Sequence, residues 1–359
     1  MILFLVVLLL SAAAQSADLL PGMPPLVDAH DVYAADRPGN MSPAVRDFPS
    51  RIYVPNSGRD TVDVIDPRTF KIVDHFPVER QPQHVTPAYD LKTLWVLNDL
   101  GDSITRIDPA TGHKLDTVKV KDPYNMYYTP DGHYAIVVAE RTRRLDFRDP
   151  QTMKLVESVQ VPCRGVDHMD FSANGRYLVA SCEFSSQVVK VDVATRKVLG
   201  SLTLPGNAMP QDVRLAPDGA IFYVADMMGG GVFIVDGEAL KMLGFVSTGK
   251  GAHGLYFSRD SKWLYVSNRG EGTIGLIDVK TRQLSTKWTI PGGGSPDMGG
   301  VSADGKVLWL SGRYHAEVYA IDTSDGHLLA RIPVSKGPHG LCVFPQPGRY
   351  SLGHTGNMR

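Results

Sequence analysis

The fold is decided by residues 265–278, which read Tyr265-Val266-Ser267-Asn268, then Arg269-Gly270-Glu271-Gly272, then Thr273-Ile274-Gly275-Leu276-Ile277-Asp278. Aromatic and β-branched residues flank a polar turn that contains glycine. This pattern is typical of two short antiparallel strands joined by a tight turn. The same pattern recurs along the chain, so it is the unit from which the architecture is built.

An aspartate that ends a strand marks each copy of the repeat. Ile or Val precedes it in six copies, and Arg148 precedes it in the third. The markers are Asp66, Asp108, Asp149, Asp192, Asp236, Asp278 and Asp322, and subtraction gives spacings of 42, 41, 43, 44, 42 and 44 residues. A period of about 40 to 45 residues with several short strands per unit predicts the blades of a β-propeller.

The strand count at the two ends of the repeat predicts how the ring closes. The first unit lacks an inner strand before Arg51, and an extra strand follows the last unit at residues 340–344. If that C-terminal strand completes the first blade, no sheet edge stays open. We therefore predict an all-β, seven-bladed propeller with four-stranded antiparallel blades over residues 51–345, an N-terminal arm at 18–50 and a C-terminal tail at 346–359.

Three of the strand ends carry a specific resemblance. Tyr53-Val54-Pro55-Asn56, Tyr223-Val224-Ala225-Asp226 and Tyr265-Val266-Ser267-Asn268 resemble the repeat of the YVTN-type β-propeller family. The resemblance spans roughly Arg51 to Pro345. It implies the propeller fold. At the level of fold it also extends to lactonase-like enzymes and to haem and copper redox propellers, and fold alone does not choose among these activities.

Composition and the N-terminus bear on location and partners. The chain of 359 residues has a formal net charge of -1, which argues against a nucleic-acid partner, because such a partner favours a strongly basic face. Residues 1–10 are an unbroken apolar run followed by small residues, which predicts a signal peptide at 1–17. No later segment is apolar enough to span a membrane. We expect a periplasmic or extracellular monomer.

One position of the repeat gathers polar residues at the start of every innermost strand. Its seven members are His84, Asn125, His168, Asp212, His253, Asp297 and His339. Strand starts on one face of a propeller surround the central channel, so we predict a polar ring at the channel mouth. Arg269 and Arg313, at the ends of second strands, are expected at its rim and would suit an anionic small molecule.

The four histidines of this ring allow more than one interpretation. Imidazole is a good ligand for transition metals, so His84, His168, His253 and His339 form a candidate metal site, with a transition metal as the candidate cofactor. Alternatively, each histidine fills a repeated structural slot. Two functions fit: an exported binding protein for a small molecule, metal or protein partner, and a metal- or cofactor-dependent oxidoreductase or lactonase-like hydrolase. No catalytic motif decides whether the chain is an enzyme.

The three cysteines are a separate question. Cys163 and Cys182 are expected on the same face of neighbouring strand ends, and in an exported protein a disulfide between them is the favoured interpretation. A metal site formed by Cys163, His168 and Cys182 is the alternative. Cys342 lies within a central strand and is expected to be a buried thiol.

Overall fold

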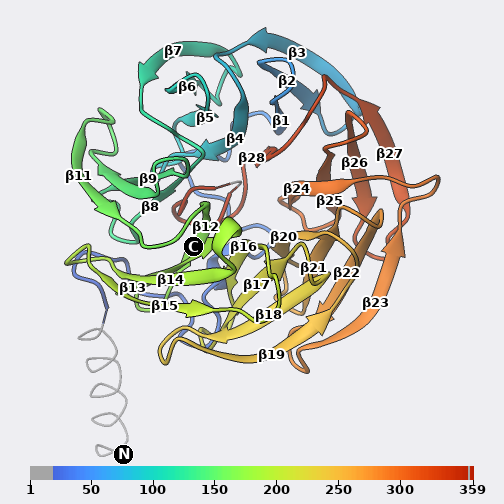
Figure 1. Cartoon of the computed structure of the whole chain (residues 1–359). Helices are drawn as coiled ribbons and strands as arrows, with labels where there is room; N and C mark the ends of the chain where they lie inside the picture. Colours follow the sequence, from blue (N-terminus) through green and yellow to red (C-terminus); the bar gives the residue numbers. More distant parts are fainter. Residues whose placement is uncertain (1–18, 355) are drawn as a thin grey trace, which may run out of the picture.

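The computed structural model describes residues 19–354 and 356–359, so the predicted signal peptide lies outside the described residues. The strands form seven four-stranded antiparallel sheets arranged as blades around a central axis (Figure 1). This confirms the predicted fold class. Two short 3-10 helices, η1 (Ala34–Asp36) and η2 (Glu183–Ser185), accompany the strands. Within the described part of the chain, no helix has the length and apolar character needed to cross a membrane.

Each blade has its innermost strand at the axis and its fourth strand at the outside. From inside to outside, blade 1 consists of β28 (Cys342–Phe344), β1 (Arg51–Asn56), β2 (Thr61–Asp66) and β3 (Lys71–Pro77), and blade 2 of β4 (Pro82–Pro87), β5 (Leu94–Asn98), β6 (Ser103–Ile107) and β7 (Lys114–Lys119). Blade 3 consists of β8 (Asn125–Tyr128), β9 (Ala135–Ala139), β10 (Arg144–Arg148) and β11 (Leu155–Gln160), and blade 4 of β12 (Val166–Phe171), β13 (Tyr177–Cys182), β14 (Gln187–Asp192) and β15 (Val198–Thr203). Blade 5 consists of β16 (Pro210–Leu215), β17 (Phe222–Asp226), β18 (Gly231–Asp236) and β19 (Lys241–Ser247). Blade 6 consists of β20 (Ala252–Phe257), β21 (Trp263–Asn268), β22 (Thr273–Asp278) and β23 (Gln283–Thr289). Blade 7 consists of β24 (Pro296–Val301), β25 (Val307–Gly312), β26 (Glu317–Asp322) and β27 (Leu328–Pro333).

Burial follows position within the blade. The innermost strands β4, β12, β16 and β24 are buried along their whole length, whereas β7 and β11 are mostly exposed. Apolar side chains of adjacent blades fill the space between the sheets. Ile52 and Val54 of blade 1, for example, pack in one cluster with Trp309 of blade 7. Burial of apolar surface between blades therefore holds the ring together.

The C-terminal strand closes the ring as predicted. β28 pairs antiparallel with β1, and the register places Cys342 opposite Tyr53 and Val343 opposite Ile52. Cys342 is a buried free thiol, as expected. Because β28 supplies the innermost strand of blade 1, the chain has to return to the axis near its end, and this return determines where the following residues lie.

The N-terminal arm covers one of the two faces of the ring. We call this the arm face; it carries the turns between the first and second strands of the blades. Leu20 N donates to Asn174 O at 2.8 Å, Val32 N donates to Pro217 O at 2.8 Å, and the Tyr33 hydroxyl donates to Leu215 O at 2.8 Å. The opposite face, which we call the open face, carries the loops between the second and third strands.

The C-terminal segment, residues 345–359, crosses the axis on the same side as the arm. The chain ends near the centre of the ring in Figure 1. Tyr128 N donates to Leu352 O at 2.9 Å and His354 N donates to Met126 O at 2.8 Å, so this segment is bound to the inner strand of blade 3. The guanidinium of Arg359 lies over the Tyr33 ring and donates to Asp170 at 3.0 Å. The channel is therefore closed from the arm face.

Replacement of Asp170 by Ala tests whether these terminal segments stabilise the propeller. The buried Asp170 carboxylate accepts hydrogen bonds from Leu215 N, Asn357 and Arg359, and its loss leaves the Arg359 cation buried and unpaired. We expect D170A to lower the free energy of unfolding by about 3–5 kcal/mol in a denaturant titration. The control D47A changes an exposed arm carboxylate and should stay within about 0.5 kcal/mol of the parent. Equal stabilities of D170A and D47A would contradict this role.

Candidate functional site on the propeller axis

The seven predicted ring residues all lie at the axis, but they are inside the channel instead of at its surface. None of them is more than 2% exposed. In five blades the ring residue coincides with a shift in register between the first and second strands. These shifts lie at Pro82/His84, Val166/Met169, Pro210/Val213, Ala252/Leu255 and Pro296/Gly299. Such irregularities redirect side chains, and here they accompany the residues that line the axis.

The four ring histidines form a closed circuit of neighbouring imidazoles. Their ring centroids are 5.4 Å apart for His84 and His168, 6.1 Å for His168 and His253, 5.6 Å for His253 and His339, and 4.8 Å for His339 and His84. The repeat position therefore does bring these residues together. Their hydrogen-bond partners, however, divide them into two groups.

The first group is held by Asp297. The Nδ1 atoms of His253 and His339 lie 3.1 and 2.8 Å from the two oxygens of its carboxylate, and Arg269 donates to it at 3.2 Å. Burial alone would raise the pKa of Asp297, but His253, Arg269 and Arg313 outweigh it and lower that pKa. His253 and His339 thus already have a structural partner, Asp297, through which blades 6, 7 and 1 are joined.

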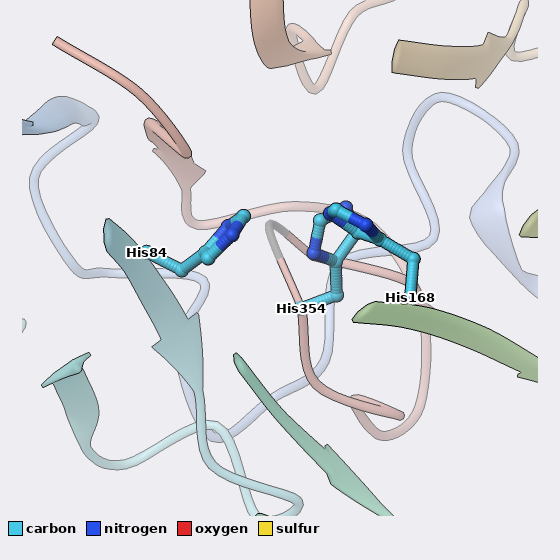
Figure 2. A group of neighbouring side chains, drawn as sticks. All are labelled: His84, His168 and His354. Carbon is cyan, nitrogen blue, oxygen red and sulfur yellow. The ribbon is translucent and has the colours of Figure 1, made fainter. Parts of the chain in front are cut away.

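The second group consists of His84, His168 and a residue outside the predicted ring, His354. Figure 2 shows their side chains converging from different parts of the chain. Each offers a ring nitrogen, and these three nitrogens all lie within 4.8 Å of one another. All three residues are buried. His354 comes from the C-terminal segment and lies in no repeat, which is why its role could not be inferred from the spacing.

The three imidazoles of this second group, which we call the axial triad, have few hydrogen bonds. Counting only the residues that the structure describes, neither ring nitrogen of His84 has a hydrogen-bond partner. His168 Nδ1 lies 2.8 Å from Asp167 Oδ1, a close charge contact that is not aligned as a hydrogen bond. His354 Nδ1 lies 3.1 Å from Asn125 Nδ2, and its Nε2 is unpartnered among the described residues. Buried polar atoms without partners are uncommon in folded proteins, so these ring nitrogens require an explanation.

Backbone features permit this convergence. A Cβ atom added to Gly340 would lie 2.0 Å from His84 Nδ1, so only glycine at this position leaves room for the ring. Gly353, next to His354, has φ +93°, and a Cβ there would lie 2.5 Å from Met126 O. The Leu352-Gly353-His354 sequence is thus a tight turn that aims an imidazole at the axis. In the sequence, the only indication of this role of His354 is its position next to Gly353 in the C-terminal tail.

The remaining predicted ring residues support the site without completing it. Asn125 contacts His354, whereas the Asp212 carboxylate accepts hydrogen bonds from Val213 N and from Leu255 N of the next blade. Asp212 Oδ1 is 3.8 Å from His354 Nε2. Asp212 therefore mainly joins two blades.

Burial also sets the protonation of the triad. Desolvation, followed by nearby cationic groups, lowers the pKa of His84 and of His354 well below the usual value of 6.5. Desolvation would lower the pKa of His168 as well, but the charge of Asp167 outweighs it and raises that pKa. At neutral pH, His84 and His354 consequently have unprotonated nitrogens that can coordinate a metal.

On the open face above the triad, basic and acidic side chains lie on different sides of the axis. Arg269 and Arg313, the predicted rim residues, lie on the side of blades 6 and 7, where both are within 4.0 Å of Asp297. Glu140 and Glu183 lie on the side of blades 3 and 4. Desolvation, together with repulsion from Asp167 and Glu183, raises the pKa of Glu140 to about 8. Desolvation and repulsion from Asp167 raise the pKa of Glu183 to about 7.

Cys163 and Cys182 are joined by a disulfide in the structure. The bond lies at the open-face end of blade 4, where it ties the segment before β12 to the end of β13. Its sulfur atoms are therefore not available to a metal. His168 belongs instead to the axial triad.

Comparison with known proteins identifies the family to which the chain belongs. A family model described as YNCE-like beta-propeller matches residues 17–349. The chain belongs to the YNCE-like β-propeller family. YncE of Salmonella typhi is 24% identical over 254 residues, covering 64% of this chain and 69% of that protein. YncE of Escherichia coli K12 is 25% identical over 249 residues, covering 63% and 68%.

Solved structures share the fold at low sequence identity. Hydrazine synthase of Kuenenia stuttgartiensis matches with a TM-score of 0.67 at 21% identity, covering 81% of this chain and 97% of that chain. The dihydro-heme d1 dehydrogenase NirN matches with a TM-score of 0.62 at 17% identity, and the match covers 89% of this chain and 78% of that chain. A 6-phosphogluconolactonase-like protein of Bacteroides uniformis matches with 0.64 at 15%, covering 81% and 98%. At these identities the similarity shows the fold alone.

The raised pKa of Glu140 predicts how stability depends on pH. The folded state keeps the Glu140 proton up to about pH 8, whereas the unfolded state loses it near 4.5, so folding takes up a proton between these values. The free energy of unfolding should therefore fall as pH rises through this window, and E140Q should reduce that decline. The matched control E79Q changes an exposed glutamate and should keep the parental slope. Denaturant titrations at several pH values measure it. Identical slopes for E140Q and the parent would be inconsistent with a half-buried, protonated Glu140.

Proposed function

We propose that this protein is an exported binding propeller that holds a transition-metal ion on its axis, with His84, His168 and His354 as ligands. One observation carries the proposal: three buried imidazoles offer nitrogens within 4.8 Å of one another, and His84 has no hydrogen-bond partner within the described ranges. An unsatisfied buried polar group costs about 1–3 kcal/mol. A bound ion would remove that cost at all three rings.

The chemistry of the donors selects the class of ion. Neutral imidazole nitrogen suits Zn, Cu, Ni and Fe, whereas Ca and Mg prefer oxygen ligands. Desolvation lowers the pKa of His84 and His354, which favours the neutral rings that a metal needs. Asp167, 2.8 Å from His168 Nδ1, is placed to orient that ring, as carboxylates do behind many metal-bound histidines.

The spacing requires a modest rearrangement on binding. Nitrogens bound to zinc at about 2.0–2.1 Å in a tetrahedral site lie about 3.4 Å apart. The triad nitrogens are within 4.8 Å, so rotation about side-chain torsions has to draw them together. Because Gly340 has no Cβ atom, no side chain at that position blocks the His84 ring. Three protein ligands would leave a fourth position for water or a small ligand.

Export is the second part of the proposal. The apolar run at residues 1–10 and the small residues after it support secretion. The disulfide between Cys163 and Cys182 suits an oxidising compartment. We therefore place the protein in the periplasm or outside the cell, where it would bind its metal.

Metal titration of single-histidine variants tests this function. The purified full chain is stripped with a chelator and titrated with Zn²⁺ or Co²⁺, and bound metal is counted by elemental analysis. We expect about one ion per chain for the parent. H84Q, H168Q and H354Q should each weaken binding by more than the roughly 10–100-fold that loss of a supporting partner costs. D167N, which removes a supporting group, should fall within that range.

Two control variants sharpen the result. H113Q changes an exposed histidine on the outer edge of blade 2 and should bind like the parent. H253Q changes a ring histidine that Asp297 already holds, so it separates the axial triad from the four-histidine set that the repeat predicts. Thermal melting checks that each variant is folded. Absence of saturable binding of Zn²⁺, Co²⁺, Cu²⁺ or Ni²⁺ by the folded parent, or unchanged affinity in H84Q, would refute the axial triad as a metal site.

A further inference from the structure

A second feature of the open face lies beside the axis, at the junction of blades 7 and 1. It is a pocket of about 280 Å³ lined by Ser57, Gly58, Arg313, Tyr314, Ala316, Lys336 and Gly337. Pockets for drug-sized ligands start near 300 Å³, so this one suits a ligand of few atoms. Two lining residues are cationic, and none of the described lining residues carries a carboxylate.

The guanidinium of Arg313 is only partly satisfied. Its Nη1 is buried and, among the residues placed by the structure, has no hydrogen-bond partner. The nearest carboxylate oxygen, Asp297 Oδ2, is 4.0 Å away, beyond hydrogen-bond distance. That carboxylate is already engaged by Arg269 at 3.2 Å and by His339 at 2.8 Å. Arg313 thus retains donors that an incoming acceptor can use.

The local charge balance also favours an anion. Among the residues that the structure describes, Asp297 is the one carboxylate that forms an ion pair with Arg269 or approaches Arg313. Lys336 adds a third cation, and it forms no ion pair with any of these residues. Tyr314, whose ring lies 5.4 Å from the Arg269 guanidinium, is exposed at the edge of the pocket. Excess positive charge in a partly enclosed site attracts negatively charged ligands.

The equivalent junction of blades 3 and 4 provides a comparison within the same molecule. Its pocket is also rich in arginine, with Arg141, Arg143 and Arg164 among its lining residues, but it contains Glu140. Arg141 is moreover neutralised by Asp99, Asp102 and Asp122. The pocket at blades 7 and 1 therefore differs from its repeat counterpart by having no carboxylate among its described lining residues.

We propose that the pocket between blades 7 and 1 binds a small oxyanion, a phosphate or a carboxylate, through Arg313 and Lys336. The planar fork of arginine matches two oxygens of such a group, and the lysine ammonium adds a point charge. The anion lies beside the axial histidines, since Arg313 is 4.0 Å from Asp297 and Asp297 contacts His339. The site stands on its own residues and goes beyond the proposed metal function.

Calorimetric titration with inorganic phosphate and, separately, with acetate tests this site. The full chain is used after chelation, so that metal does not contribute. We expect saturable binding of at least one of the two anions, weakened at least about tenfold in R313A and several-fold in K336A, with R313K intermediate. Added NaCl should weaken it further. Binding of phosphate alone points to phosphorylated ligands, and binding of acetate alone points to carboxylates.

Two further variants make the result decisive. R143A removes an arginine from the equivalent pocket of blades 3 and 4 and should bind like the parent. H84Q, altered in the proposed metal site, should retain anion binding, which separates failure of this inference from failure of the metal proposal. Folding of each variant is checked by thermal melting. Affinity in R313A equal to that of the parent, or no saturable binding of either anion by about 10 mM, would overturn the proposal.

Discussion

The pairing of β28 with β1 is the constraint on which the rest of the structure depends. It completes the first blade, so the ring has no open sheet edge. It also forces the chain to return to the axis shortly before its end. The residues after β28 then cross the channel on the arm face, where hydrogen bonds to the inner strand of blade 3 place His354 opposite His84 and His168. The strand that closes the fold is thus directly followed by the segment that completes the axial site.

This arrangement explains why the two halves of the histidine cluster differ. His253 and His339 are bound to a carboxylate that the repeat itself supplies from blade 7. His84 faces a glycine on one side and the C-terminal segment on the other, so it has neighbours but no hydrogen-bond partner within the described chain. A repeat supplies the same position in every blade, and the different neighbours at each position determine which copies can bind a ligand.

The fold could be predicted from sequence because its signal is repeated. Seven aspartate markers, the strands before them and the surplus strand at 340–344 together determine blade number and closure. The ring of polar residues at the axis followed from the same register. Its depth did not, because register shifts and two covering segments bury it, and neither has a periodic signal. His354 was missed for the same reason. The engagement of His253 and His339 by Asp297 depends on contacts between blades, which spacing within a chain does not give.

We propose that the C-terminal segment supplies a metal ligand to a site otherwise built by the repeat. X-ray absorption spectroscopy of the zinc-loaded parent and of H354Q tests it most directly, because it counts imidazole ligands at the metal itself. We expect about three imidazole nitrogens at about 2.0–2.1 Å from the zinc ion of the parent, and one imidazole fewer around any zinc that H354Q still binds. Sulfur ligands at about 2.3 Å, a shell of oxygen ligands alone, or an unchanged imidazole count in H354Q would contradict it.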